Sequence, residues 1–135
     1  MRHRVHKKNF GRNTLQRKAL FRNLMVNLFM HERIETTVTK AKAIKSLAEK
    51  VVTLGKKGDL HSKRRALSYV PNRAAIAKLF SEIAPRFSKR NGGYLRVVKT
   101  RTRLKDQAPL AVLEFVDYEE RQAAEQKTTK EDKKS

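Results

Sequence analysis

The sequence contains no cysteine, no long apolar run and few acidic residues. Without cysteine the chain forms no disulfide bond, offers no thiol nucleophile and builds no cysteine zinc site. No stretch of about 18 consecutive apolar residues is present, so the sequence predicts no membrane-spanning segment. The apolar residues that follow the basic start alternate with polar ones instead of forming an export signal, and we therefore expect a cytoplasmic protein.

Signatures of catalysis and of cofactor binding are also missing from the sequence. The glycine patterns of mononucleotide and dinucleotide loops do not occur. His3 and His6 are three residues apart, which is not the spacing of a metal site. The acidic residues before the tail are dispersed instead of paired: Glu32, Glu35, Glu49, Asp59, Glu82, Asp106 and Glu114. The sequence thus predicts no enzyme, no bound metal and no cofactor.

Positive charge dominates what the sequence does contain. Lysine and arginine number 33 against 13 aspartate and glutamate, which gives a net charge of +20. Such an excess repels itself in a folded domain, and it favours a polyanionic partner, most often a nucleic acid. The first 31 residues hold no acidic residue at all. The segment after Asp117 is nearly neutral and rich in Glu, Gln, Lys and Thr, so residues 118–135 are predicted to be a flexible charged tail.

Apolar periodicity predicts an α+β fold, with a basic extended N-terminal arm at residues 1–12 and one globular domain at residues 13–117. The domain is expected to hold about four helices and a small mixed or antiparallel sheet of about three strands. The helices are predicted at 14–30, 40–54, 60–69 and 73–84, and the strands within 31–38, at 94–103 and at 110–116. The last strand is apolar on both faces, which favours a central position in the sheet.

Single residues mark several boundaries of these elements. Asn13 or Thr14, then Thr39, then Asn72 are candidate helix caps, because their side chains accept hydrogen bonds from free backbone amides. Gly55 is predicted to end the second helix, and Pro85 to end the fourth.

Four basic sets are candidate contacts for a phosphate backbone. The first is the arm, the second the exposed side of the first helix, the third the start of the second helix, and the fourth the loop and hairpin after Pro85. The arm contains Arg2, His3, Arg4, Lys7, Lys8 and Arg12, and the first helix contains Arg17, Lys18, Arg22 and Asn23. The set at the start of the second helix is Thr36, Thr37, Lys40 and Lys42. The loop and hairpin contain Arg86, Lys89, Arg90, Gly92, Gly93, Arg96, Lys99, Arg101 and Arg103.

Each set also has a structural explanation that involves no ligand. A charged terminus, a solvated helix face or a charged strand edge needs no partner. Capping and strand propensity explain Thr36 and Thr37 equally well. Tyr94 beside the Gly-Gly turn is expected to pack, although an aromatic ring there could stack on a base.

Several segments resemble a known family, the bacterial-type ribosomal large-subunit protein seventeen. They keep family order and spacing over residues 1–117, and the block from Ile34 to Lys42 is the most specific. The segments are Met1-Arg2-His3-Arg4, Arg22-Asn23-Leu24, His31-Glu32-Arg33-Ile34 with Thr36-Thr37, Lys40-Ala41-Lys42, Arg64-Arg65, Ala77-Lys78-Leu79-Phe80, Pro85-Arg86-Phe87, Gly92-Gly93-Tyr94 and Ala108-Pro109. Phe10 and Gln16 depart from it, since the family often has Leu and His there.

The resemblance implies a structural constituent of the large ribosomal subunit. Such a protein binds large-subunit rRNA, supports subunit assembly and translation, and is located in the ribosome. The resemblance adds Arg64 and Arg65 to the candidate rRNA contacts. It also implies neighbouring large-subunit proteins, including number thirty-two, as partners.

Two other functions compete with this expectation. A DNA-binding architectural or regulatory protein could use the helices at 60–69 and 73–84 as a helix-turn-helix, although Pro71 interrupts the turn. A small basic ribonuclease would require a general acid and a general base placed together, for which the sequence offers only scattered candidates.

Overall fold

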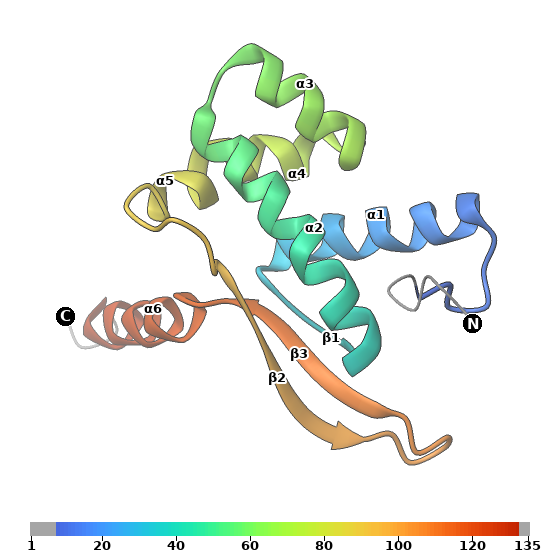
Figure 1. Ribbon diagram of the computed structural model, residues 1–135. Coiled ribbons are helices and arrows are strands. Elements are labelled where there is room, and N and C mark those ends of the chain that lie inside the picture. Colours follow the sequence, from blue (N-terminus) through green and yellow to red (C-terminus); the bar gives the residue numbers. More distant parts are fainter. Residues whose placement is uncertain (1–7, 133–135) are drawn as a thin grey trace.

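The computed structural model describes residues 8–132, with side chains up to residue 126, and it confirms the α+β fold. Figure 1 shows α1–α5 above the β2–β3 hairpin and α6 beside its upper end, with the turn of the hairpin reaching away from the helices. The elements are α1 (Thr14–His31), β1 (Arg33–Thr37), α2 (Val38–Lys57), α3 (Leu60–Tyr69), α4 (Arg73–Lys78), a π-helical segment η1 (Leu79–Ile83), α5 (Ala84–Arg86), β2 (Leu95–Thr102), β3 (Pro109–Phe115) and α6 (Tyr118–Asp132).

The sheet has three strands in the order β1-β3-β2, and both pairings are antiparallel. The predicted central strand, β3, is confirmed. Ile34, Leu113 and Val97 stand in register across the sheet and pack against the core. Helix α2 contacts all three strands on that face. The residues that alternate with this row, such as Val112, therefore belong to the opposite face of the sheet.

The core is formed where α1, α2 and the sheet meet. Leu28 and Phe29 of α1 are fully buried, and the ring centroids of Phe29 and Phe115 lie 6.4 Å apart. Met25 of the same helix is also buried. Burying a large side chain stabilises a fold by about 1.5–3 kcal/mol, so these contacts fix how α1 crosses the domain.

Two of the predicted helix caps are confirmed and one is wrong. Asn13 and Gln16 form a reciprocal capping box, and the Asn72 side chain accepts a hydrogen bond of 2.9 Å from the Ala75 amide. Helix α2, however, begins at Val38 with Thr37 as its N-cap residue, so Thr39 lies inside the helix. The helix starts directly where strand β1 ends, with no residue left over as a connection.

Gly55 does not end α2, as the sequence suggested, but lies buried within it. A Cβ atom at this position would lie 3.1 Å from the Ala84 Cβ and 3.3 Å from the Leu79 Cγ. The glycine therefore serves close packing between helices. The helix continues to Lys57, and Gly58 ends it with a φ of +72°, a conformation that glycine adopts without steric cost.

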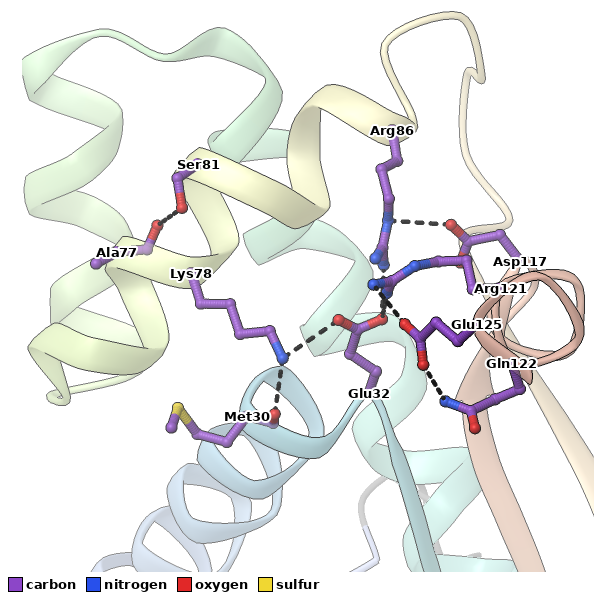
Figure 2. A network of polar contacts seen from close by, with 10 residues as sticks. All are labelled: Met30, Glu32, Ala77, Lys78, Ser81, Arg86, Asp117, Arg121, Gln122 and Glu125. Atoms are coloured by element: carbon purple, nitrogen blue, oxygen red, sulfur yellow. Dashed lines mark hydrogen bonds and ion pairs between the residues drawn. The ribbon is translucent and has the colours of Figure 1, made fainter. Parts of the chain in front are cut away.

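Pro85 does not end the fourth predicted helix either. The chain stays helical from Arg73 to Arg86 by widening into the π segment η1, where the Ala84 amide bonds to the Leu79 carbonyl. A proline inside a regular α-helix would clash with the carbonyl four residues earlier, and a π segment is one way in which a helix changes its local hydrogen bonding. The helical residues of η1 and α5 place the Arg86 side chain beside Glu32 (Figure 2).

The described end of the predicted extended arm is a turn folded back on α1. The Arg12 amide bonds to the Asn9 carbonyl at 3.0 Å, and both Phe10 and Gly11 have positive φ. The Phe10 ring packs edge-on against Phe21, with centroids 5.9 Å apart. The Arg12 guanidinium donates to the Phe10 carbonyl at 2.8 Å. The sequence did not predict this packing of Phe10. The rest of the predicted arm, residues 1–7, lies outside the described residues.

The predicted flexible tail starts with residues that are tied to the domain. Helix α6 has no apolar stripe, and for this reason hydrophobic periodicity did not predict it. Its first turns are held by charge instead: Arg86 pairs with Asp117 at 3.0 Å, Arg96 pairs with Glu119 at 2.9 Å, and the Arg33 guanidinium lies 5.6 Å from the Tyr118 ring centre.

Glu32 is the acidic centre that holds the helices to the end of the sheet (Figure 2). It follows α1 in the left-handed conformation, with φ +63°, and only 4% of its surface is exposed. Its carboxylate accepts a hydrogen bond of 2.9 Å from Arg86 and another from Arg121, and it lies 3.2 Å from the Lys78 ammonium. Lys78 also donates to the Met30 carbonyl at 2.8 Å. One buried carboxylate thus joins α1, α4, α5 and α6.

The Glu32 cluster predicts a specific pH dependence of stability. Burial raises the pKa of Glu32, but hydrogen bonds from Arg86, Arg121 and Lys78 outweigh burial and lower it from 4.5 to about 2. A carboxylate with a depressed pKa stabilises the fold above pH 4.5, and this contribution is lost as the pH falls toward 2. We expect the free energy of unfolding to fall by about 3 kcal/mol over that interval from this group.

Urea denaturation at a series of pH values measures this contribution. Glu32→Gln should remove the part of the slope between pH 5 and pH 2 that the depressed pKa of this carboxylate produces. It should also lower the free energy of unfolding at neutral pH by about 3 kcal/mol. Glu82→Gln, at an exposed position in η1, is the matched control and should keep the wild-type pH profile. A Glu32→Gln profile parallel to that of the wild type would contradict the assignment.

Candidate nucleic-acid interface

An open groove brings together cations from three separate parts of the chain. The end of the arm contributes Lys8, α1 contributes Arg17, and α2 contributes Lys42. The groove has a volume of about 520 Å³. We call it the α1–α2 groove, and its lining residues are Lys8, Arg17, Phe21, Thr39, Lys42, Ala43 and Ser46.

The electrostatics of the α1–α2 groove suit a phosphate. No acidic residue lines it, and within residues 8–132 its three cations form no ion pair. Arg17 is oriented by the Asn9 side chain at 3.2 Å and by the Arg12 carbonyl at 3.4 Å. Its guanidinium is therefore placed beside the groove by neutral groups, which leave its positive charge uncompensated.

Thr39 and Ser46 are groove residues that the sequence analysis missed. Both lie on α2 and line the groove, so their hydroxyl groups can donate to a phosphate oxygen. Thr39 was interpreted only as a cap. Thr39 lies three residues before Lys42, so the two side chains share one face of a helix. This spacing was the signal that the sequence offered for Thr39.

A second hollow lies on the other side of α1, where it meets α2 and α3. Its volume is about 400 Å³. We call it the α1–α3 hollow, and its lining residues are Lys18, Phe21, Arg22, Met25, Leu47, Ser68 and Tyr69. The predicted contacts Lys18 and Arg22 thus lie together, and Phe21 borders both the hollow and the groove.

Two predicted contacts, Arg86 and Arg96, are engaged inside the protein. Arg86 pairs with Glu32 and with Asp117. Arg96 pairs with Glu114 at 2.7 Å and with Glu119 at 2.9 Å, and hydrogen bonds to these carboxylates raise the pKa of Arg96. Both arginines thus have acidic partners within the chain, and their contact with RNA stays a prediction.

The cations of the hairpin are only partly brought together. Lys99 and Arg101 lie on β2, whereas Arg103 follows the strand. The register shifts between Lys99 and Thr102, and this β-bulge interrupts the alternation that would place all three side chains on one face. Arg101 lies 3.5 Å from Glu35, and Arg103 lies 3.2 Å from Asp106.

The basic residues of the loop before β2 have acidic residues near them in the structure. Lys89 and Arg90 are exposed, but the hollow that they line also contains Asp117 and Glu120. Gly92 and Gly93 have φ values of +129° and +60°, so the turn itself accounts for both glycines. Tyr94 is buried and packs against Phe87, with ring centroids 5.4 Å apart, which confirms that it packs rather than stacks on a base.

The other predicted contacts are spread over the surface or lie outside the described residues. Thr36, Thr37 and Lys40 are half-buried and do not line the groove. Asn23, Arg64 and Arg65 are exposed on α1 and α3. Four members of the first set fall among residues 1–7, which the structure leaves undescribed: Arg2, His3, Arg4 and Lys7.

The described part of the chain shows neither a metal-binding cluster nor a membrane-spanning helix. Among residues 8–132, no three histidine, aspartate or glutamate side chains gather closely enough to hold a metal ion. None of the helices in these residues is both long and apolar enough to cross a membrane.

Comparison with known proteins identifies the family. The model of the family described as ribosomal protein L17 matches residues 20–116. The chain belongs to the ribosomal protein L17 family. It is 62% identical to the large ribosomal subunit protein bL17 of Thermodesulfovibrio yellowstonii over 135 residues, which cover 100% of this chain and 99% of that protein.

More distant relatives carry the same name. The bL17 protein of Symbiobacterium thermophilum is 54% identical over 106 residues, or 78% of this chain and 94% of that protein. The bL17 protein of Desulfotalea psychrophila is 50% identical over 124 residues, or 92% of this chain and 96% of that protein. These matches confirm the family resemblance and give no support to the DNA-binding alternative.

The α1–α2 groove predicts how salt affects RNA binding. Lys42→Gln should weaken binding of large-subunit rRNA and reduce the slope of log affinity against log salt by about one, because one phosphate contact is lost. Filter binding over a series of salt concentrations measures this slope. Lys57→Gln, an exposed lysine at the far end of α2, is the matched control. A Lys42→Gln slope equal to that of the wild type would remove Lys42 from the interface.

Proposed function

We propose that this chain is a structural protein of the large ribosomal subunit that binds large-subunit rRNA through its α1–α2 face. The observation that carries the proposal is the α1–α2 groove, in which three cations and two hydroxyl groups converge and no carboxylate is present. The names of the relatives, which are large ribosomal subunit proteins, support the same role.

Binding through the groove follows from the chemistry of phosphate. Each cation that neutralises a phosphate releases a condensed counterion, and this gain in entropy drives association. The hydroxyl groups of Thr39 and Ser46 add hydrogen bonds that orient the backbone. Lys8, which lines the groove, is preceded in the sequence by three more cations, Arg2, Arg4 and Lys7.

The proposed role is structural and not enzymatic. Holding RNA in place requires charge, hydroxyl groups and a rigid scaffold, all of which the α1–α2 face provides. The role also needs no metal or cofactor from the protein. Supporting assembly of the subunit is part of the same proposal, because a protein that bridges separate rRNA segments stabilises their relative arrangement.

A neighbouring ribosomal protein would find a different surface on the opposite side of the sheet. Val98 is 43% exposed, whereas its cross-strand partner Val112 is buried. The arginines beside them, Arg33 and Arg96, are already paired with Glu114. An exposed valine among compensated charges suits a protein more than RNA. Within the proposal, ribosomal protein number thirty-two is the specific neighbour that the family resemblance implies.

Sedimentation after a salt wash tests the proposed function. The tagged chain, expressed in the organism that it comes from, should remain with the large subunit through a wash of about 1 M salt. At this concentration the Debye length falls to about 3 Å, so loosely bound basic proteins leave the subunit. An unrelated protein of similar positive charge is the control and should wash off. Loss of both proteins at the same salt concentration would overturn the proposal.

A further inference from the structure

We propose that the α1–α3 hollow binds one unpaired nucleotide of the rRNA, with the base inside and its phosphate on the rim. This inference rests on the proposed function and adds a second kind of contact to it. The α1–α2 groove has three cations and two hydroxyl groups among its lining residues, whereas the hollow places two cations beside the side chains of Phe21, Met25, Leu47 and Tyr69.

The floor of the hollow is apolar and rigid. Met25 is 1% exposed and belongs to the core, and Phe21 and Leu47 pack against that core from above. An apolar surface open to solvent in a chain this charged gains free energy when it is covered. The volume of about 400 Å³ lies within the usual range for small-ligand sites, which extends from roughly 300 to 1,000 Å³.

The wall provided by α3 carries the groups that a base requires. The Tyr69 ring is half-buried at the end of the helix, and aromatic rings are the usual stacking partners of splayed RNA bases. Within the described residues the Tyr69 hydroxyl has no hydrogen-bond partner, so it is free to read a base edge. The Ser68 hydroxyl donates to the Arg65 carbonyl at 2.7 Å, which leaves its oxygen able to accept.

The rim determines which occupant fits. Lys18 and Arg22 are exposed one turn apart on α1, and neither forms an ion pair in the described part of the chain. Like charges at this spacing repel each other mildly, and a phosphate between them would relieve the repulsion. An aliphatic side chain of a protein would leave both cations unpaired. A nucleotide satisfies the apolar floor and the cationic rim together.

The position of the hollow connects it to the groove. Phe21 borders both, with Arg17 on the groove side and Lys18 on the other. A single RNA strand whose phosphates contact the groove can therefore cross α1 and reach the hollow with its next nucleotides. The two sites then act on one strand instead of on two unrelated parts of the RNA.

Filling the hollow without changing charge tests the inference. Ser68→Trp places an indole in the hollow from an exposed position, and Ser68→Ala is the matched control. We expect Ser68→Trp to bind large-subunit rRNA of the same organism about tenfold more weakly at every salt concentration, because one stacked base is lost. The slope of log affinity against log salt should not change, because no phosphate contact is lost. Binding by Ser68→Trp that equals that of Ser68→Ala would overturn the inference.

Photo-crosslinking identifies the occupant directly. The full chain with p-benzoylphenylalanine in place of Tyr69 is assembled into large subunits and irradiated, and the linked nucleotide is mapped by primer extension. A crosslink to an unpaired nucleotide supports the inference. A crosslink to another ribosomal protein, or only to base-paired nucleotides, overturns it.

If Lys42→Gln weakens binding while Ser68→Trp does not, the inference fails and the proposed function stands. If the wild-type chain leaves the subunit in the salt wash, the proposed function fails.

Discussion

The ionised carboxylate of Glu32 is the contact on which the arrangement of the helices depends. It lies at the exit of α1, nearly excluded from water, and three cations from α4, α5 and α6 converge on it. A buried charge is unfavourable unless it is paired, and removing the Glu32 carboxylate would take from all three cations the partner that they share. The cluster therefore fixes the position of the helices as a set. It also holds the otherwise polar helix α6 against the domain.

The distribution of the few acidic residues separates the protein into two kinds of surface. Around the sheet and α6, Glu32, Glu114 and Glu119 compensate the arginines that face them. Helix α1 contains no acidic residue, and neither does the first half of α2. The cations that line the α1–α2 groove therefore have no acidic residue beside them. The ion pairs that stabilise the fold thus leave the cations of the α1–α2 face unpaired, which is the basis for proposing it as the RNA-binding surface.

Local features were predictable from the sequence, and long-range pairings were not. The caps Asn13 and Asn72 and the central strand β3 follow from residue type and apolar pattern, and the structure confirms them. Arg86 was predicted as an RNA contact, because no local signal shows that it pairs with Glu32, 54 residues earlier. Helix α6 was missed for the same reason, since ionic contacts with distant residues hold it and no apolar stripe marks it. Gly55 was wrongly predicted to end the second helix, because the sequence alone does not show that two helices pack closely at this residue.

Lysine acetylation followed by mass spectrometry, on the free chain and on assembled large subunits, measures directly whether the α1–α2 face meets the RNA. We expect Lys18 and Lys42, which form no ion pair in the described part of the chain, to react readily in the free chain and to become protected in the subunit. Lys78, which is bound to Glu32, should react slowly in both states. Equal reactivity of Lys18 and Lys42 in the two states would contradict the account, because the α1–α2 face would then not be the surface that meets the RNA.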